Sequence, residues 1–268
     1  MTTNLIIAPP AAGKTATCID RILAIHKEKP LARVWVVVPN SQKAAYFKKR
    51  LAEAGGSMGV KVGAFRNFYQ EILEENGWFT PVITPALSYR LIQETVDEAF
   101  SAGELRHYAA IKDKPGFLTV LRDAFAELRS GMVRPSAFLD YTREASPARS
   151  ELAILYDRFL ARQETLGWVD TEGQAWQAIG ALENNPSIGS GLSLVIADGF
   201  TSFTASQRQF LKQLSQKVGD LYITLTGEIG STRQVDGRLL GVLTDLQTDL
   251  SPDIIEHIAS PRLPENVL

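Results

Sequence analysis

The chain has 268 residues, and its 28 basic and 30 acidic side chains give a formal net charge of -2. Hydrophobic residues make up 45% and charged residues 22%, which is ordinary for a globular protein and excludes collagen-like, coiled-coil and wholly disordered chains. The single cysteine, Cys18, excludes a disulfide scaffold and an all-cysteine metal cluster within these residues. No apolar run is long enough to span a membrane and the start lacks a signal-peptide pattern, so we expect a cytoplasmic protein with no membrane partner.

Short apolar runs predict the strands of a parallel sheet. Most of these runs are apolar on both alternating faces, which is typical of strands buried on both sides of an α/β sheet. Apolar residues at helical spacing follow the first run, at Ile19, Ile22 and Leu23, and a similar pattern follows the second. The five predicted strands are Asn4 to Ala8, Val34 to Val38, Val60 to Ala64, Leu192 to Ala197 and Leu221 to Leu225.

The middle of the chain has the pattern of helices only. Apolar residues repeat at helical spacing from Leu87 to Leu160, and the strand pattern resumes after Asn184-Asn185-Pro186. We therefore expect an α/β domain with a parallel sheet, formed by residues 1–80 plus 187–268, that is interrupted by an all-helical insertion at residues 81–186.

Charge is distributed unevenly along the chain. Residues through Thr80 carry 11 basic and 6 acidic side chains, whereas the remainder carries 17 basic and 24 acidic ones. A basic segment is a weak indication of a polyanionic partner, and a solvated helix face explains Lys48, Lys49 and Arg50 at least as well. Charge alone therefore does not predict nucleic-acid binding.

A phosphate-binding pattern directly follows the first predicted strand. The segment from Ala8 to Thr15, APPAAGKT, matches G-x-x-x-x-G-K-[ST] at every position except the first, where Ala8 replaces glycine. A strand that feeds a tight turn and a helix directs backbone N–H groups and the positive helix end at a phosphate. We therefore predict an ATP site in which Lys14 reaches the outer phosphates and Thr15 ligates Mg²⁺. The predicted nucleotide-binding residues are Ala11, Ala12, Gly13, Lys14, Thr15 and Ala16.

The best candidate for an acidic partner of this loop is Asp198, which ends the fourth predicted strand. Enzymes with such a loop hold Mg²⁺ with a carboxylate at the end of a neighbouring strand, often followed by a glutamate that orients water. We predict that Asp198 is the catalytic carboxylate, which ligates Mg²⁺ together with Thr15. Because the next residue is Gly199, we expect metal binding without efficient hydrolysis; a simple strand-ending turn at Asp198-Gly199 is the alternative.

Several segments together resemble a known family. APPAAGKT, then VVVPNSQKAA from Val36 and VGAFRNF from Val62, resemble motifs I, Ia and Ib of superfamily 1 helicases of the UvrD/Rep/RecB type. DGFTSFT from Asp198 resembles the motif II of one group among them, the AddB-type subunits of bacterial helicase-nucleases. KPGFL from Lys114, ELRSG from Glu127 and WVD from Trp168 resemble the helical insertion of that group. The likeness covers most of the chain, and the order of the motifs is more specific than any one of them.

The resemblance implies a RecA-like P-loop NTPase domain from a protein that processes double-strand DNA breaks with a partner helicase-nuclease subunit. It also implies that the loops of motifs Ia and Ib face single-stranded DNA, with weak binding because a second motor domain supplies the other wall of the channel. The chain departs from the family at Ala8 and Gly199, and it stops before the arginines of a second motor domain and before a nuclease domain, so we expect a fragment or a shortened relative with no nuclease centre. The DNA-binding residues implied are Asn40, Ser41, Lys43, Phe65 and Arg66.

Alternatives to an ATP-binding helicase-like domain follow from the same residues. A non-hydrolysing DNA-scanning or interaction module with a vestigial loop is favoured by Gly199 and opposed by the survival of Lys14, Thr15 and Asp198. An unrelated P-loop kinase would need an acceptor-binding lid, which we do not find. A core position for Phe65 and a solvated helix position for Lys43 explain these two residues as well as DNA contact does.

Overall fold

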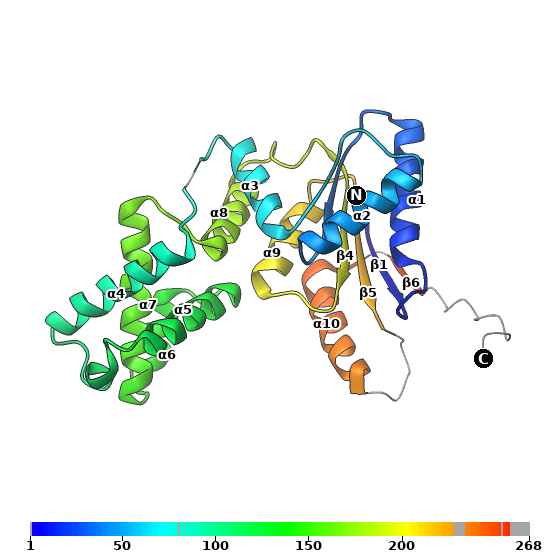
Figure 1. The fold of residues 1–268 in the computed structure, drawn as a ribbon. Helices are drawn as coiled ribbons and strands as arrows, with labels where there is room; N and C mark the ends of the chain where they lie inside the picture. The colour runs from blue at the N-terminus through cyan, green and yellow to red at the C-terminus, as the bar shows by residue number, and fades with distance from the viewer. Residues whose placement is uncertain (1, 80, 228–233, 253, 258–268) are drawn as a thin grey trace. The chain divides into compact units, whose positions relative to one another are not determined.

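The computed structural model describes residues 2–79, 81–227, 234–252 and 254–257, and Figure 1 shows its fold. Six parallel strands form one sheet in the order β3-β2-β4-β5-β1-β6. β5 therefore lies between β1 and β4, and β3 and β6 are the edge strands. The strands are β1 (Thr2–Ala8), β2 (Arg33–Val37), β3 (Val60–Gly63), β4 (Leu192–Phe200), β5 (Asp220–Thr226) and β6 (Ile254–His257).

Contacts within the chain divide it into two compact units. The sheet unit comprises the residues up to 77, residues 178–203 and the residues from 207 onward, and the helical unit comprises residues 78–177 with 204–206. The helices are α1 (Lys14–Glu28), α2 (Ser41–Glu53), α3 (Phe65–Glu75), α4 (Pro85–Ser101), the short η1 (Ala109–Ile111), α5 (Pro115–Ser130), α6 (Pro135–Thr142), α7 (Pro147–Leu166), α8 (Thr171–Asn184), α9 (Ala205–Ser215) and α10 (Gln234–Leu250).

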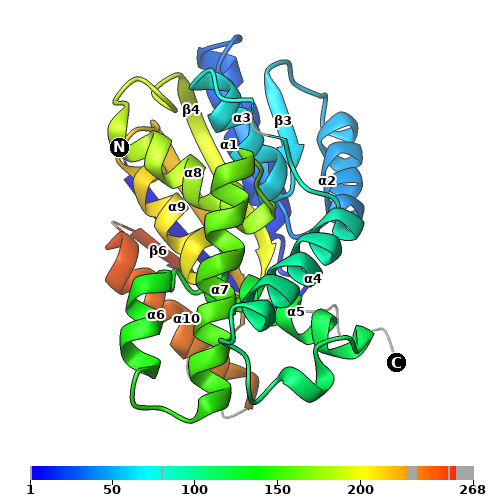
Figure 2. The same cartoon turned by 90° about the vertical axis from the view of Figure 1, so that its left-hand side faces the viewer.

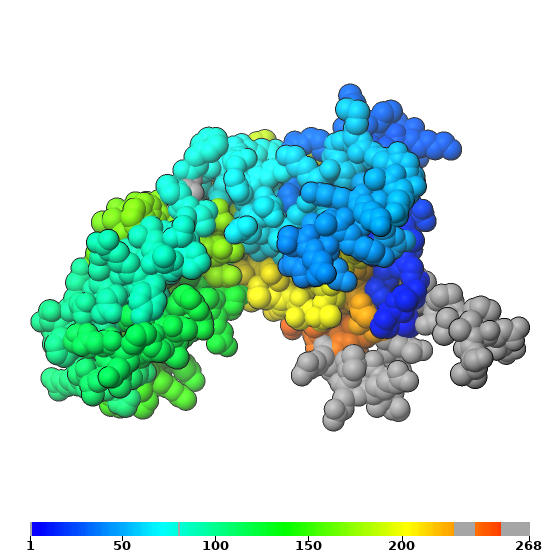
Figure 3. All heavy atoms as spheres, in the orientation of Figure 1, coloured from blue at the N-terminus to red at the C-terminus, as the bar shows by residue number. Residues whose placement is uncertain are grey.

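Helices cover both faces of the sheet because its strands are apolar on both sides. On one face, α1 and α2 pack against strand residues such as Val34 and Val36, and the side chains of α2 cover the strands behind it in Figure 3. On the other face, Trp35 of β2 stacks on Phe68 of α3 with ring centroids 4.5 Å apart, and Phe68 meets Phe210 of α9. Figure 2 shows these helices from another side.

The predicted fold class, a parallel α/β sheet interrupted by helices, is confirmed. The five predicted strands correspond to β1 to β5, and β4 continues to Phe200, beyond the predicted end at Ala197. β6 (Ile254–His257) was not predicted. It pairs with β1 at the sheet edge, so its four residues depend on a tertiary partner rather than on a long local pattern. Asp253, the residue before β6, lies outside the described residues.

A buried arginine joins three helices of the helical unit. Nη1 of Arg129, near the end of α5, donates to Oδ1 of Asp170 at 2.6 Å and to Oε1 of Gln163 at 2.7 Å. Oδ1 of Asp170 also accepts the backbone N–H of Gly173 at the start of α8. The Trp176 indole N–H donates to the Arg129 carbonyl at 2.9 Å. These bonds link α5, α7 and α8 through one residue that is 5% exposed.

Among the described residues, no helix of either unit has the length and apolar character needed to cross a membrane.

Candidate functional site

The turn between β1 and α1 contains two residues with left-handed backbone conformation directly before the helix. Gly13 adopts a left-handed φ of 90° at the N-cap of α1, and Ala11 has a φ of 61°. A glycine takes this conformation without strain, whereas a side chain at position 13 would be strained. Gly13 has no side chain to cap the helix, so the first N–H groups of α1 have no side-chain partner at the N-cap. A helix start of this kind attracts anions.

Lys14 folds back onto the loop that precedes it. Its Nζ donates to the carbonyl oxygens of Ala8 and Pro9, both at 2.8 Å, and the residue is only 9% exposed. Burial lowers the pKa of Lys14 from its ordinary value, and the negative charge of Asp198 partly offsets this by raising it. The two carbonyls and the nearby carboxylate therefore hold the Lys14 ammonium group close to the loop.

Asp198 lies next to the start of α1, although 183 positions separate it from Thr15. The Thr15 hydroxyl donates to Oδ2 of Asp198 at 2.9 Å, and Asp198 is 6% exposed. The hydroxyl of Thr224, on β5, donates to Oδ1 of Asp198 at 2.7 Å. Sequence reasoning missed Thr224 because nothing in the local pattern of β5 distinguishes it from other buried strand residues. The order of the sheet places it beside Asp198.

The paired Thr15 hydroxyl and Asp198 carboxylate suit a hard divalent cation. Mg²⁺ prefers oxygen ligands and is commonly held by one or two protein groups, with phosphates and water completing its shell. Within the described residues, no group of three or more histidine, cysteine, aspartate or glutamate side chains could hold a metal alone. The site therefore fits a Mg²⁺ ion that arrives with a nucleotide better than one held by the protein alone.

Gly199 breaks the regular pairing of β4 directly after Asp198. The register between β4 and β5 shifts between Ala197 and Phe200, and Gly199 has a left-handed φ of 81°. Its backbone N–H donates to the Thr224 hydroxyl at 3.0 Å instead of continuing the ladder. An L-residue with a side chain in this conformation is strained. The backbone conformation at position 199 therefore disfavours a glutamate after Asp198, so the difference is more than a change of side chain.

Phe65 is a core residue, which argues against its predicted role of stacking a DNA base. The residue is 6% exposed. Its ring packs against Tyr69, Phe200, Phe203 and Phe210, with centroid distances of 5.7, 5.3, 6.4 and 6.3 Å. A ring in such a cluster loses these contacts if it turns outward to stack on a base. The aromatic spacing in the sequence is thus explained by packing between α3, α9 and the end of β4.

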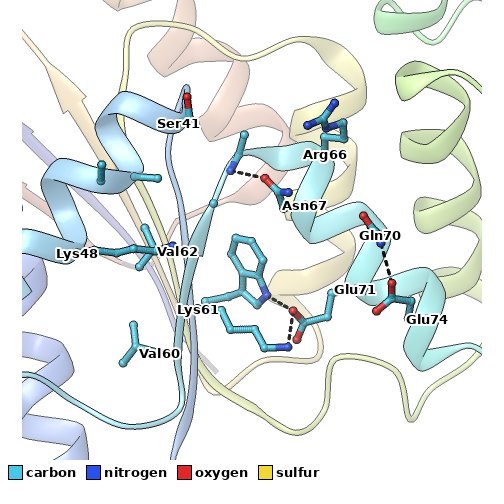
Figure 4. A pocket seen from close by; sticks show the side chains of 15 residues that line it. Ser41, Lys48, Val60, Lys61, Val62, Arg66, Asn67, Gln70, Glu71 and Glu74 are labelled. Atoms are coloured by element: carbon cyan, nitrogen blue, oxygen red, sulfur yellow. Dashed lines mark hydrogen bonds and ion pairs between the residues drawn. The ribbon is translucent and has the colours of Figure 1, made fainter. Parts of the chain in front are cut away.

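The other predicted DNA-binding residues are exposed at the starts of α2 and α3. Ser41 and Arg66 line a pocket beside the edge strand β3, and Lys48 and Lys61 add positive charge to it (Figure 4). Its opposite wall includes Glu71, which pairs with Lys61 at 2.9 Å and accepts the Trp35 indole N–H at 2.7 Å. Of the cations that line this pocket, Arg66 lies at the start of α3, Lys48 lies further along α2, and Lys61 is paired with Glu71.

Asn40 and Lys43 flank the first turn of α2. Asn40 is the N-cap residue, and its side-chain oxygen accepts the backbone N–H of Lys43 at 2.9 Å. At α3 the bond runs the other way, because Oδ1 of Asn67, in the first turn, accepts the backbone N–H of the N-cap residue Ala64 at 3.1 Å. Both caps follow from amide side chains near a helix start. The Lys43 side chain is exposed and available to a phosphate.

The chain matches the sequence model of a family described as "ADDB, N-terminal" over residues 5–239. The chain belongs to this family. A relative from Exiguobacterium sibiricum is 25% identical over 232 residues, covering 81% of this chain and 19% of the relative. Another, from Alkaliphilus metalliredigens, is 26% identical over 246 residues, covering 86% of this chain and 20% of the relative. Both are named as subunits of an ATP-dependent helicase/deoxyribonuclease, and the chain spans about one fifth of their length.

The family match confirms the resemblance to AddB-type N-terminal regions. It extends across the loop around Lys14, the acidic residue Asp198 and the newly found Thr224. The nucleotide, metal and DNA roles of individual residues stay predictions. The structure places Lys14, Thr15 and Asp198 together at one end of the sheet, and it places Ser41 and Arg66 together at a separate pocket.

Proposed function

We propose that this chain is the ATP-binding, helicase-like domain of a helicase-nuclease subunit that processes DNA double-strand breaks. The observation that carries the proposal is the arrangement of Lys14 and Thr15 on a strand-turn-helix loop with Asp198 in hydrogen-bond contact across the sheet. Loop N–H groups and Lys14 would bind the phosphates, and Thr15 with Asp198 would hold Mg²⁺. The names of the relatives agree with this proposal, because they describe an ATP-dependent helicase and deoxyribonuclease.

Calorimetric titration of ATP and of ADP into the purified chain tests this proposal. With Mg²⁺ present, we expect binding with micromolar to millimolar affinity, because the loop offers both N–H donors and a cation to the phosphates. Replacing Mg²⁺ by EDTA should weaken the binding, because the Thr15 and Asp198 oxygens then face the phosphates without a bridging metal. An absence of nucleotide binding in Mg²⁺ would overturn the proposal.

We expect binding without efficient hydrolysis. Gly199 stands where ordinary helicases of this type have a water-orienting glutamate, and a charge-stabilising arginine from a second motor domain is typically worth about 10³–10⁵ in rate. This feature also favours the second candidate function, a non-hydrolysing interaction module. Such a module binds nucleotide structurally or not at all, so titration with and without Mg²⁺, followed by an ATPase assay, separates the two candidates.

Restoring a glutamate by Gly199→Glu should not restore ATP turnover. A side chain at a φ of 81° costs about 1–2 kcal/mol, and the irregular backbone does not present it as a regular strand would. We expect a lower melting temperature and phosphate release at the wild-type level, with and without DNA. Gly241→Glu is the control, since Gly241 lies in α10 with an ordinary φ and open space around it. A DNA-stimulated turnover in the Gly199 variant would contradict this expectation.

The proposed role in break processing further includes a partner helicase-nuclease subunit and single-stranded DNA. The partner is supported by the names of the relatives, which describe them as subunits rather than as whole enzymes. The DNA contact is supported by the exposed cations Lys43 and Arg66 at the starts of neighbouring helices. Both lie after strand ends, where α/β sheets place their binding sites. Phe65 is left out of the proposed DNA site because it is buried.

The double substitution Lys43→Ala, Arg66→Ala should weaken single-stranded DNA binding. Each phosphate contact that is lost should reduce the slope of log affinity against log salt by about 0.7. Fluorescence anisotropy with a labelled oligonucleotide over a range of salt concentrations measures both quantities. Lys27→Ala, Lys29→Ala is the matched control, because it removes the same charge from exposed positions at the other end of α1. Equal losses in the two double variants would mean that overall charge, not this site, binds DNA.

A further inference from the structure

The Thr224 hydroxyl makes two hydrogen bonds, one with Asp198 and one with its neighbour Gly199. It donates to Oδ1 of Asp198 at 2.7 Å and accepts the backbone N–H of Gly199 at 3.0 Å. Thr224 is fully buried in β5, which lies between β1 and β4. One hydroxyl therefore satisfies a buried carboxylate and also the N–H that the irregularity in β4 removes from the ladder.

The two oxygens of Asp198 are held in different ways. Oδ2 accepts from Thr15, whose hydroxyl is itself a candidate metal ligand, whereas Oδ1 accepts from Thr224. A hydroxyl has one hydrogen and two lone pairs, so Thr15 would keep its bond to Oδ2 while a lone pair ligates a metal. The bond from Thr224 does not compete with the metal. It fixes the orientation of the carboxylate in this structure.

We propose that Thr224 is a positioning residue that holds Asp198 for Mg²⁺, so that the site retains metal-dependent nucleotide binding although it has no glutamate after Asp198. Thr224 acts through Asp198 and does not contact nucleotide in this arrangement. Partners of this type, which orient a metal ligand, typically change metal affinity by about 10–100-fold when they are removed. This inference rests on the proposed nucleotide-binding function.

Thr224→Val tests the proposal, because it keeps the branched shape of the side chain and removes only the hydroxyl. With a fluorescent ATP analogue bound to the chain, titration of Mg²⁺ gives the apparent metal affinity, and a parallel titration of the analogue in EDTA gives metal-free binding. We expect the apparent Mg²⁺ affinity to fall about 10-fold or more, with metal-free binding unchanged because Lys14 and the loop are intact. Thr224→Ser keeps a hydroxyl and should restore the Mg²⁺ affinity.

A control variant and a second substitution keep the test decisive. Thr95→Val removes a buried hydroxyl in the helical unit, where Thr95 donates to the Leu91 carbonyl at 2.8 Å, and should leave Mg²⁺ affinity unchanged. If melting shows that Thr224→Val does not fold, Thr224→Cys replaces it, since a thiol is only a weak donor. Wild-type Mg²⁺ affinity in folded Thr224→Val or folded Thr224→Cys would overturn the role of Thr224. Failure of the wild-type chain to bind nucleotide would instead overturn the proposed function.

Discussion

Lys14→Ala should remove most of the nucleotide binding of this chain. Hydrogen bonds to charged groups are worth about 1.5–3 kcal/mol, which corresponds to a loss in affinity of about 10- to 100-fold for ATP. The fold should tolerate the change, because burial lowers the pKa of Lys14 and its charge is therefore held at a cost. Calorimetry with ATP in Mg²⁺ measures the affinity, and thermal melting confirms that the variant is folded.

Lys27→Ala is the matched control for the Lys14 substitution. Lys27 is exposed in the last turn of the same helix, α1, far along the chain from the loop. Removing it changes the net charge by the same amount but should leave ATP affinity at the wild-type value. Identical ATP binding by the Lys14 variant and the wild type would show that the loop is not the nucleotide site. The DNA prediction would survive that result, because it depends on separate residues.

Arg129→Met should strongly destabilise the helical unit. The Arg129 and Asp170 side chains are 6% and 24% exposed, and breaking a buried pair by removing one partner typically costs about 3–5 kcal/mol. The loss also leaves the Gln163 oxygen without the bond that Arg129 donates at 2.7 Å. Urea unfolding followed by circular dichroism and by tryptophan fluorescence measures the effect, since Trp168 and Trp176 belong to this unit.

Arg122→Met is the control on the same helix, α5. Arg122 pairs with Asp123 at 2.8 Å, but their side chains are 41% and 66% exposed. Surface pairs of this kind contribute about 0–1 kcal/mol, so the control should unfold close to the wild-type urea concentration. If Arg129→Met were no more damaging than Arg122→Met, the three-helix junction around Arg129 would not be a stabilising feature of the unit.

The local pattern of the sequence was sufficient for the fold class and for three residues of the candidate site, Lys14, Thr15 and Asp198. Lys14 and Thr15 are recognisable because strand, turn and helix follow each other within a few residues, and the geometry of such a loop is local. The five predicted strands and the helical segment were also readable, because burial on both faces leaves long apolar runs. The edge strand β6 was not, since it is short and depends on pairing with β1.

The tertiary structure alone decided that Thr224 meets Asp198 and that Phe65 is buried. Thr224 reaches Asp198 only because β5 lies between β1 and β4, and the order of strands in a sheet is not written in any one of them. Phe65 follows a strand end, as a DNA-contacting residue would, yet it is buried among rings contributed by α3, α9 and the end of β4. By itself, the sequence determined the local loop that presents Lys14, because hydrogen bonding within a turn depends on neighbours in the chain. The contact of Thr224 with Asp198 and the burial of Phe65 depend on packing between distant segments, which no local pattern specifies.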